Sequence, residues 1–572
     1  MKRQQALNRR GYTLDRIARR GRVPARRRAT WHALLFSALL SSAGASELDT
    51  NIVGQPPTTA WPTFNGDYTG RRYSTLDQIN EHNVASLQLQ WSYRITNVGA
   101  QRGAPVPVIK STPLLVNGTL YFTIPNNVYA VDARTGTELW HYSWVDEGGH
   151  LVGNRGVGMY KQWLYFLGPD NWVICLDSAT GKERWRKQIA DARLQYFTTT
   201  APLVIRKHVL VGVGGDAMDI RGFLVSLDPE TGDEQWRWWS TPGEGEPGIE
   251  TWPSVNAALH GGGGTWLPGT YDPELNLIYW GTGNTNPVFA GQGRKGANLY
   301  TASIVALNPD TGKLAWHFQV SPHDTHDWDN IETPVLIDAD IDGKPRKLLA
   351  QAARNGWFVV LDRTNGKALV STPYVKLNWA KGVDKRGQPI PDPAKEPKVA
   401  GSMTITSATN WMSPSYSPDT GLFYVNSVEG FAIYYLLDTD PKPSGYGGTA
   451  TGLGTSKRVL KALDIRTGKV RWQHEYPNLN GAPPTVGPGL LSTAGNLLIT
   501  GDDQGNLIAY TADQGRILWH FRAGAAQSNG PMTFMMDGRQ WIVMAAGDTL
   551  YAYALAPAAL QAAGPSLTRS QP

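Results

Sequence analysis

The chain has 572 residues, only 18% of them charged, and it is rich in glycine (62), tryptophan (22) and tyrosine (23). This composition is typical of an all-β protein with many turns rather than of a helical one. The net charge is +6, but residues 1–45 hold eleven Lys or Arg against one Asp, so the remaining chain carries −4 and a basic nucleic-acid-binding body is excluded.

Residues 1–45 have the pattern of a signal peptide. A long basic region precedes a short apolar run at 31–42, and small residues follow at 43–45. We expect cleavage after Ala45, and therefore secretion. An uncleaved anchor is the less favoured interpretation, because the apolar run is too short to span a bilayer comfortably. No other stretch predicts a membrane segment in the mature chain, and residues 558–572 are expected to form a disordered C-terminal tail.

A repeated unit runs along most of the chain. It consists of an apolar residue, Asp, two further residues, Thr-Gly, three residues and Trp, and some copies are imperfect. The copies lie at 131–140, 176–185, 227–236, 307–316, 463–472 and 511–519, with a further copy at 361–367 that lacks the Trp.

Each copy predicts a β-hairpin. An alternating apolar strand precedes the unit, as at 119–123, 163–166 and 277–280, and the Asp-x-x-Thr-Gly segment is a tight turn in which Gly can take a positive φ. The spacing between adjacent copies is 45 to 51 residues, which matches one four-stranded propeller blade. The longer intervals 236–316 and 367–472 leave room for insertions or degenerate blades.

The two ends of the chain supply a further blade in this interpretation. Seven copies are visible, and the segment 61–91 would pair with 541–544 and 550–554 to complete an eighth, which removes exposed sheet edges. Eight blades are preferred and seven are the alternative. The tryptophans are expected to pack one blade against the next. The single cysteine, Cys175, lies in the apolar stretch 172–176 and is expected to be a buried thiol.

The segment 321–330 concentrates acidic residues directly after a predicted blade. Asp327 and Asp329 stand two residues apart, so in an extended segment both face the same way. Two converging carboxylates repel each other unless a cation lies between them, and oxygen ligands favour a hard ion such as Ca²⁺ or a lanthanide. A solvated acidic loop is the alternative. His323 and His326 do not predict a zinc site, because no further His or Cys cluster accompanies them.

The repeats resemble the tryptophan-docking units of the PQQ-dependent methanol and ethanol dehydrogenases, which use pyrroloquinoline quinone (PQQ). The opening 61–68 and the stretches 72–74 and 76–80 are also similar to that family, and the resemblance covers nearly all of 58–556. It implies an all-β, eight-bladed β-propeller of four-stranded antiparallel sheets over 46–557.

The same resemblance implies a periplasmic enzyme that oxidises a small primary alcohol to the aldehyde with PQQ and Ca²⁺ or a lanthanide(III) ion. Electrons would pass to a separate soluble cytochrome c, because the chain has no Cys-x-x-Cys-His motif for covalent haem. A homodimer is left open. Nucleic acid is not an expected partner.

Catalytic and metal-binding roles follow from the resemblance. Asp327 matches the proposed general base for the alcohol hydroxyl, and Asp329 matches the extra aspartate of lanthanide-using members. Asn284, in Gly281-Thr-Gly-Asn284, matches a metal ligand through its amide oxygen, although the motif alone is an ordinary strand-ending turn. A lanthanide is favoured over Ca²⁺, because a trivalent ion prefers one more negative ligand.

Cofactor contacts are implied in the same way. Trp266 matches the indole that stacks on the quinone, although it could be another inter-blade anchor, and Arg354 matches the arginine at the quinone oxygens. The remaining matches are Arg155 for a PQQ carboxylate, Thr199 as a hydrogen-bond donor, Asn355 beside Arg354, and Asn410 with Trp411.

Three departures from the family pattern stand out. The adjacent cysteines of the family are absent from 148–154, so another group must cover that face of the quinone. The family's metal-binding Glu aligns with Ala217. Asp216 or Asp219 could replace it, and Asp219 is favoured, because a shift of two residues keeps the same face of a strand. Lys110 replaces a family Glu and could pair with a PQQ carboxylate.

Two alternatives to an active enzyme remain. Similar propellers serve as non-catalytic scaffolds in outer-membrane assembly, and a degenerate quinoprotein could bind PQQ without turnover. The enzyme is preferred, because a scaffold does not need the joint presence of five polar site residues, namely Arg155, Asn284, Asp327, Asp329 and Arg354.

Overall fold

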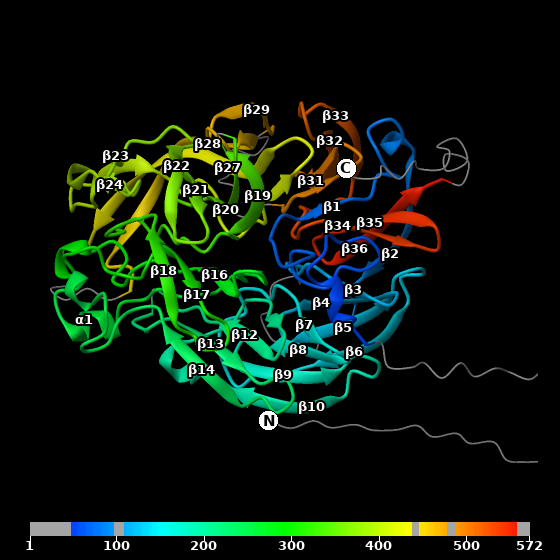
Figure 1. The fold of residues 1–572 in the computed structure, drawn as a ribbon, viewed down its shortest axis with the longest axis horizontal. Coiled ribbons are helices and arrows are strands. Elements are labelled where there is room, and N and C mark those ends of the chain that lie inside the picture. The colour runs from blue at the N-terminus through cyan, green and yellow to red at the C-terminus, as the bar shows by residue number, and fades with distance from the viewer. Residues whose placement is uncertain are drawn as a thin grey trace, which may run out of the picture. The chain divides into compact units, whose positions relative to one another are not determined.

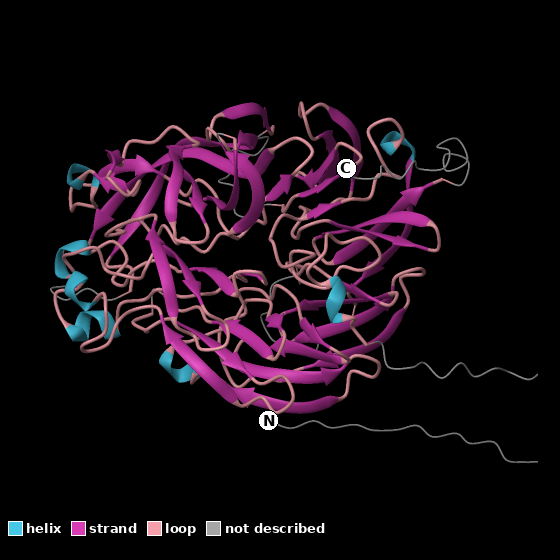
Figure 2. Ribbon diagram, in the orientation of Figure 1, coloured by secondary structure: helices cyan, strands magenta, loops and turns pink. Residues whose placement is uncertain are grey.

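The computed structural model describes residues 47–96, 108–216, 218–341, 343–437, 445–477 and 488–556, all within one compact unit. These residues form an all-β propeller, and its few helical turns lie in connecting segments (Figure 2). The signal peptide expected over 1–45, the tail expected over 558–572 and Ala217 lie outside the described residues.

Five four-stranded antiparallel sheets follow one another along the chain, and each is a meander of consecutive strands. The first two contain β3 (Leu114–Val116), β4 (Thr119–Ile124), β5 (Asn127–Asp132) and β6 (Glu138–Ser143), then β7 (Gly158–Tyr160), β8 (Trp163–Leu167), β9 (Trp172–Asp177) and β10 (Glu183–Gln188). The third contains β11 (Leu203–Ile205), β12 (His208–Gly212), β13 (Phe223–Leu227) and β14 (Glu234–Trp239). The fourth and fifth contain β15 (Thr270–Asp272), β16 (Leu277–Gly281), β17 (Ser303–Leu307) and β18 (Leu314–Gln319), then β19 (Val335–Ile341), β20 (Lys344–Ala352), β21 (Trp357–Asp362) and β22 (Lys367–Pro373).

The remaining sheets depart from this simple meander. The sixth contains β25 (Ser402–Ile405), β26 (Ser415–Ser417), β27 (Leu422–Leu436), β28 (Gly448–Asp464) and β29 (Val470–Glu475). The seventh joins β1 (Tyr73–Ser74) in parallel to β30 (Leu491–Thr493), followed by β31 (Leu497–Gly501), β32 (Asn506–Thr511) and β33 (Ile517–Arg522). The last combines β2 (Leu87–Arg94) with β34 (Met532–Met536), β35 (Arg539–Ala546) and β36 (Thr549–Leu555), and a small ribbon pairs β23 (Ala380–Val383) with β24 (Pro389–Pro391).

The helical elements are short. The only α-helix of the described residues is α1 (Val255–Leu259), and the 3₁₀ turns are η1 (Thr50–Ile52), η2 (Val84–Ser86), η3 (Ala192–Leu194), η4 (Ile249–Thr251), η5 (Gly291–Gly293) and η6 (Pro393–Lys395). The two long intervals between repeats are therefore insertions, not degenerate blades: they hold α1, the β23–β24 ribbon and an extended β27–β28 hairpin. No helix in the described ranges has the length and apolar character needed to cross a bilayer.

The sheets follow one another in a ring, and strands from the two ends of the chain meet in the last sheet (Figure 1). Strand β2 pairs antiparallel with β36, from Leu87 opposite Leu555 to Arg94 opposite Thr549. This confirms the expected pairing of the segment that ends at Trp91 with the C-terminal strands. Trp61 instead forms an isolated bridge with Leu115 of the first sheet.

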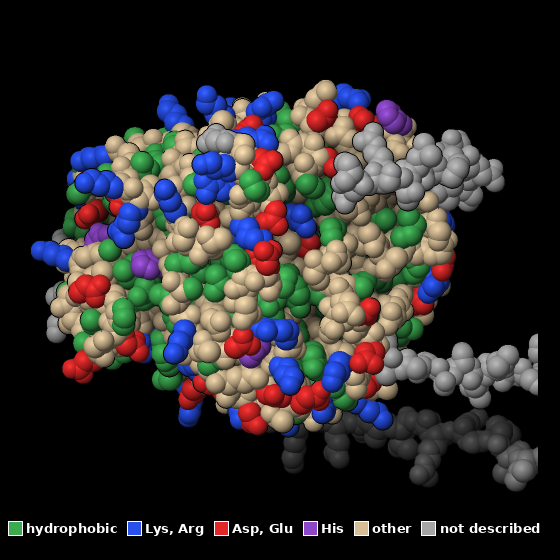
Figure 3. All heavy atoms as spheres, viewed as in Figure 1, with side chains coloured by type: hydrophobic (Ala, Val, Ile, Leu, Met, Phe, Trp, Pro, Cys, Tyr) green, Lys and Arg blue, Asp and Glu red, His purple; other side chains and the backbone are tan. Residues whose placement is uncertain are grey.

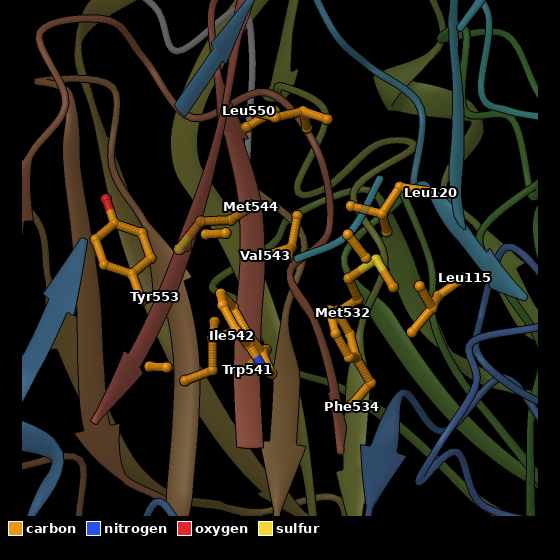
Figure 4. Packing of buried hydrophobic residues seen from close by; sticks show 14 of the residues in the cluster. Leu115, Leu120, Met532, Phe534, Trp541, Ile542, Val543, Met544, Leu550 and Tyr553 are labelled. Carbon is orange, nitrogen blue, oxygen red and sulfur yellow. The ribbon is translucent and has the colours of Figure 1, made fainter. Parts of the chain in front are cut away.

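A buried hydrophobic cluster holds this closure together. Leu115 and Leu120 of the first sheet pack in the same cluster as Met532, Phe534 and Trp541 of the last sheet (Figure 4). Similar clusters lie between the other sheets, so the core is distributed around the ring.

The repeated turns explain why neighbouring sheets stack. In the first copy the Asp132 carboxylate accepts hydrogen bonds from the backbone N–H groups of Arg134 and Thr135, at 2.9 Å each, which fixes the turn. Gly136 then takes a φ of +71°, and a Cβ built on it would lie 2.7 Å from the Trp91 ring of the preceding sheet. The same Gly–Trp contact recurs at Gly181, Gly232, Gly312, Gly366 and Gly515.

The meander also decides where a site can form. In the seven sheets that carry a repeat copy, the turn of the repeat joins the third strand to the fourth, so it lies at one end of the sheet. The turn between the second and third strands, and the connection to the next sheet, both lie at the opposite end. Residues in those two kinds of connection therefore gather at one end of the ring.

Candidate functional site

Ten of the twelve predicted site residues line a single cavity of about 380 Å³. Nine of the ten come from inter-sheet connections or from turns between second and third strands, at the end of the ring opposite the Thr-Gly turns, whereas Asn410 lies between β25 and β26 of the sixth sheet. The ten are Lys110, Arg155, Thr199, Asp216, Trp266, Asn284, Asp327, Asp329, Arg354 and Asn410, and Asn355 and Asp219 are the two that do not line it.

An ion-paired cluster of Arg354 with two carboxylates forms the acidic part of the cavity. The Arg354 guanidinium donates to the Asp327 carboxylate at 3.1 Å and also to the Asp329 carboxylate. Asp329 accepts a second hydrogen bond, of 2.6 Å, from the backbone N–H of Asn284. Burial lowers the pKa of Arg354, but Asp327, Asp329 and Glu332 outweigh it and raise that pKa overall, so the guanidinium stays charged.

Asp327 is set apart from the other carboxylates. It follows β18 in a segment where its own backbone has a φ of +63°, which is unusual for a residue with a side chain. Burial, together with the nearby Asp329, raises the pKa of Asp327 to about 7 despite the opposing charge of Arg354. A carboxylate with this pKa can accept a proton near neutral pH.

The structure places Asp216, and not Asp219, at the cavity. Residues 216 and 219 lie in a turn after β12, so the two-residue alternation of a strand does not apply there. The Asp219 carboxylate is half exposed and lies 3.4 Å from the His260 ring. This reverses the preference for Asp219 given above.

Asp216 has the features of an unsatisfied ligand. Its side chain is buried, and its Oδ1 atom has no hydrogen-bond partner among the described residues. Burial, then Asp329 and Asp327, raise the pKa of Asp216 well above its usual value. A Cβ on Gly264 or Gly283 would lie 1.8 or 1.9 Å from its two oxygens, so both glycines are needed to admit this carboxylate.

These observations fit a hard cation. Asp216, Asp327 and Asp329 repel one another in a buried space, and Asn284, which lines the same cavity, could add its amide oxygen, so this set of donors is made of oxygens. In the part of the chain that the structure describes, no three acidic, His or Cys side chains already surround one point at ligand distance. Arg354 bridges two of the carboxylates in this arrangement.

A cationic pair forms another part of the cavity. The buried Arg155 donates to the Thr199 hydroxyl at 2.5 Å, and its Nε atom lacks a partner in the described structure. Burial lowers the pKa of Arg155 to about 9. Lys110 donates to the Val152 carbonyl at 2.7 Å, and burial together with Arg155 lowers its pKa.

Two indole rings adjoin these cations. The Arg155 guanidinium lies 4.9 Å from the centre of the Trp266 ring and 5.5 Å from that of Trp411, and the Lys110 amine lies 5.8 Å from Trp411. A flat, conjugated molecule with carboxylates fits such a cavity, because indoles offer flat surfaces and cations pair with carboxylates. The residues present are therefore compatible with PQQ.

The remaining predicted residues have other surroundings. The Asn355 amide donates to the Val320 carbonyl at 3.0 Å and to the Ser321 hydroxyl at 2.8 Å, so it ties the β18–β19 connection to the β20–β21 turn and points away from the cavity. His326 stacks on Trp328 with ring centres 4.3 Å apart, and His323 contacts the Gly296 carbonyl at 2.9 Å. Cys175 is buried, as expected.

Four apolar cavity residues were not predicted, namely Val152, Phe197, Met218 and Tyr446. Val152 lies in the stretch that lacks the family's cysteines, and His150 of that stretch packs edge-on against Phe197 with ring centres 5.2 Å apart. These side chains are ordinary loop residues in the sequence, and no spacing or motif marks them.

Comparisons with protein families agree with the repeats. A family model described as glucose/ethanol/alcohol dehydrogenase, beta-propeller domain, matches residues 61–404. A second model, described as outer membrane protein assembly factor BamB, matches residues 456–560.

Similar proteins cover most of the chain. A quinohemoprotein alcohol dehydrogenase of Comamonas testosteroni is 38% identical over 535 residues, 86% of this chain and 73% of that protein. The quinoprotein alcohol dehydrogenase PedH of Pseudomonas putida is 36% identical over 561 residues, 90% of this chain and 91% of that protein.

Solved structures show the same architecture. The crystal structure of the Comamonas testosteroni quinohemoprotein alcohol dehydrogenase superposes with a TM-score of 0.80 at 32% identity, covering 92% of this chain and 84% of that one. A europium-containing methanol dehydrogenase superposes with a TM-score of 0.78 at 28% identity, covering 88% of this chain and 99% of that one.

Proposed function

Because the chain belongs to the PQQ-dependent alcohol dehydrogenase family, we propose that it oxidises a small primary alcohol to the aldehyde in the periplasm. The proposal includes cleavage of residues 1–45 and transfer of the electrons to a separate soluble cytochrome c. It also includes an eight-bladed propeller, in which each of the eight sheets of four or more strands in the described residues is one blade. The observation that carries the proposal is the cavity itself, in which Asp327 and Arg354 lie together with Arg155 and Trp266.

In this proposal the two parts of the cavity hold different groups. Asp216, Asn284, Asp327 and Asp329 would hold the metal ion, and three carboxylates favour a trivalent lanthanide over Ca²⁺. Arg155 and Lys110 would pair with PQQ carboxylates, with Thr199 and Asn410 as further polar contacts and Trp266 as the stacking surface.

PQQ with its metal ion supplies the two-electron oxidant for the carbon that bears the alcohol hydroxyl. The chain supplies the acid–base chemistry. Asp327 accepts the hydroxyl proton, for which its raised pKa is suited. Arg354 holds the Asp327 carboxylate in place. Its positive charge would also stabilise the negative charge that develops on the quinone oxygens.

A scaffold role is the second candidate, since the assembly-factor model matches 456–560. Every cavity-lining residue lies at position 446 or earlier, so that match concerns the sheets of the ring and not the cavity. A scaffold also has no need of three mutually repelling buried carboxylates. The enzyme is therefore the better-supported function.

The first test is metal-dependent PQQ binding. Apo-protein is mixed with PQQ and either La³⁺ or Ca²⁺, and quinone absorbance, melting temperature and dye-linked alcohol oxidation are measured. A ligand that binds only the folded state stabilises it by about 2.7 kcal/mol at a hundredfold excess over its Kd. Because three carboxylates favour a trivalent ion, we expect La³⁺ with PQQ to raise the melting temperature more than Ca²⁺ with PQQ does.

Two aspartate variants sharpen this test. Asp329→Ala should abolish the La³⁺-dependent stabilisation, and Asp219→Ala, which removes a carboxylate outside the cavity, should retain it. Loaded wild-type protein that oxidises no alcohol with either metal would contradict the proposed function.

A further inference from the structure

An apolar rim surrounds part of the cavity. Val152, Met218 and Tyr446 all line it, and their side chains are large and exposed, at 53%, 39% and 48% respectively. They come from three separate connections, β6–β7, β12–β13 and β27–β28. Exposed apolar side chains that converge from separate segments mark a binding surface, and this one is continuous with the cavity that holds Asp327.

Tyr446 reaches the cavity through an unusual element. β27 and β28 have 15 and 17 residues, whereas the second and third strands of the first sheet have six each. The register of this hairpin continues from Leu422 opposite Asp464 to Leu436 opposite Gly448. The extension thereby carries Tyr446 beyond the strand length of the other sheets, and the long strands stand out in Figure 1.

The described part of this turn is held against the segment that follows Asn284. The backbone N–H groups of Val288 and Phe289 donate to the carbonyls of Gly445 and Tyr446, at 2.8 and 2.9 Å. The Phe289 ring lies 5.7 Å from the Tyr446 ring. Tyr446 is thus fixed by backbone hydrogen bonds and a buried aromatic neighbour.

A second set of ring contacts ties the same hairpin to the acidic segment. Tyr434 of β27 lies 5.6 Å from Phe289 and 4.8 Å from His326, the residue before Asp327. Tyr446 and Asp327 line the same cavity, and Asp327, followed by burial and Asp329, raises the pKa of Tyr446 to about 12. One element therefore places an apolar ring in the same cavity as the proton acceptor.

We propose that Tyr446 is a specificity-determining residue whose ring packs against the hydrocarbon part of the alcohol while the alcohol hydroxyl lies at Asp327. Val152 and Met218 extend the same apolar wall. The inference rests on the proposed alcohol oxidation. It adds the identity of the residues that contact the hydrocarbon chain of the substrate. It predicts that the preference is for alcohols with an apolar chain, and that the preference depends on the Tyr446 ring and not on its hydroxyl.

The test is a chain-length series. Wild-type protein loaded with PQQ and metal is assayed with methanol, ethanol, 1-butanol and 1-hexanol. Each methylene group buried against the rim should raise kcat/KM by up to about fourfold, mainly through KM. Tyr446→Ala should lower kcat/KM for 1-hexanol by about tenfold and change it for ethanol by less than about threefold. Tyr446→Phe should keep the wild-type series.

Two controls separate the rim from other effects. Leu453→Ala removes an exposed side chain of the same hairpin that does not line the cavity, and it should leave the series unchanged. The Kd for PQQ, measured by absorbance, and the melting temperature should be similar in all variants, because Tyr446 is half exposed.

Contrary outcomes are distinct. If the wild type is active and kcat/KM depends on alcohol chain length in the same way in Tyr446→Ala as in the wild type, this inference is overturned and the proposed function stands. A change only in the KM for the electron acceptor would also overturn it, and would make the rim a docking surface for a protein. Wild-type protein that binds PQQ but oxidises no alcohol would overturn the proposed function, and this inference with it.

Discussion

Asp327 combines an unusual backbone angle, an ion pair and a raised pKa. Its backbone φ is +63°, its carboxylate is paired with Arg354 at 3.1 Å, and its pKa is raised to about 7. Strained backbone at a polar residue persists where the surroundings hold it, and here His326 and Trp328 stack on each other on either side of it. The residue is therefore fixed in position with a pKa suited to proton transfer.

Substitution of this carboxylate should lower the rate of the chemistry far more than it lowers the affinity for PQQ. Asp327→Asn keeps the shape and removes the proton acceptor, so kcat/KM should fall by about 10²–10⁴-fold. Steady-state kinetics together with PQQ titration would check this. Asp219→Asn is the matched control, because it removes an aspartate three residues from Asp216 that lies outside the cavity. Equal losses in the two variants would exclude the assigned role of Asp327.

The single cysteine should be chemically silent in the folded protein. Cys175 is fully buried on β9, and burial raises the pKa of its thiol to about 12, so almost no thiolate forms at pH 8. A thiol-reactive dye should label it only after denaturation. Rapid labelling of the native protein, with a Cys175→Ala control to confirm the site, would contradict this.

At the scale of elements, the repeated hairpin does two tasks with one turn. The Asp side chain fixes the turn, and the Gly at positive φ leaves room for the tryptophan of the preceding sheet, whose indole N–H often donates to a nearby carbonyl of the next sheet. Trp236, for example, donates to the Pro309 carbonyl at 2.7 Å. The copy at 361–367 lacks the final Trp, and Gly468 accordingly meets the Thr372 side chain instead.

A pair of glycine variants isolates this inter-sheet contact. Gly312 and Gly421 have similar φ values, +68° and +66°, but a Cβ on Gly312 would lie 2.6 Å from the Trp236 ring and one on Gly421 would meet nothing within 4 Å. Gly312→Ala should destabilise the protein by about 1–3 kcal/mol more than Gly421→Ala, because both pay the positive-φ strain and only one displaces an indole. Denaturation midpoints measure the difference, and equal midpoints would argue against glycine–tryptophan docking.

At the scale of the whole molecule, closure of the ring depends on residues from both ends of the chain. Arg72 is fully buried, and its guanidinium donates to the carbonyls of Phe64, Leu490 and Pro531 at 2.6 to 2.9 Å. Burial lowers the pKa of Arg72 to about 9. One side chain thus links the N-terminal segment to the segments that precede β30 and β34.

The surface of the ring seen in Figure 3 carries charges of both signs and no continuous basic area.

Loss of the Arg72 link should weaken the closure. Arg72→Met leaves buried carbonyls without donors, and each such acceptor costs about 1–3 kcal/mol, so a clear drop in melting temperature is expected. Arg134→Met also removes a contact between the first and last sheets, but its ion pair with Asp537 at 2.5 Å is exposed, so the melting temperature should stay close to that of the wild type. Similar melting temperatures for the two variants would show that Arg72 does not join the ends.

The sequence by itself determined the repeating hairpins, their turn chemistry, the burial of Cys175 and the pairing of the two ends. The hairpins and their turns depend on residues that are close in the chain and recur in each copy, whereas the pairing of the ends follows because a closed ring leaves no exposed sheet edge. The acidic stretch around Asp327 was also visible, since its composition is unusual.

Only the tertiary structure decided which residues share the cavity. Asp216 rather than Asp219 faces it because a turn, and not a strand, follows β12, and Asn355 points away from it although Arg354 points in. Tyr446, which lies more than a hundred residues after Asp327 in the chain, is brought into the same cavity by the β27–β28 hairpin. Such proximity arises from connections of different sheets that meet at one end of the ring, and no local pattern encodes it.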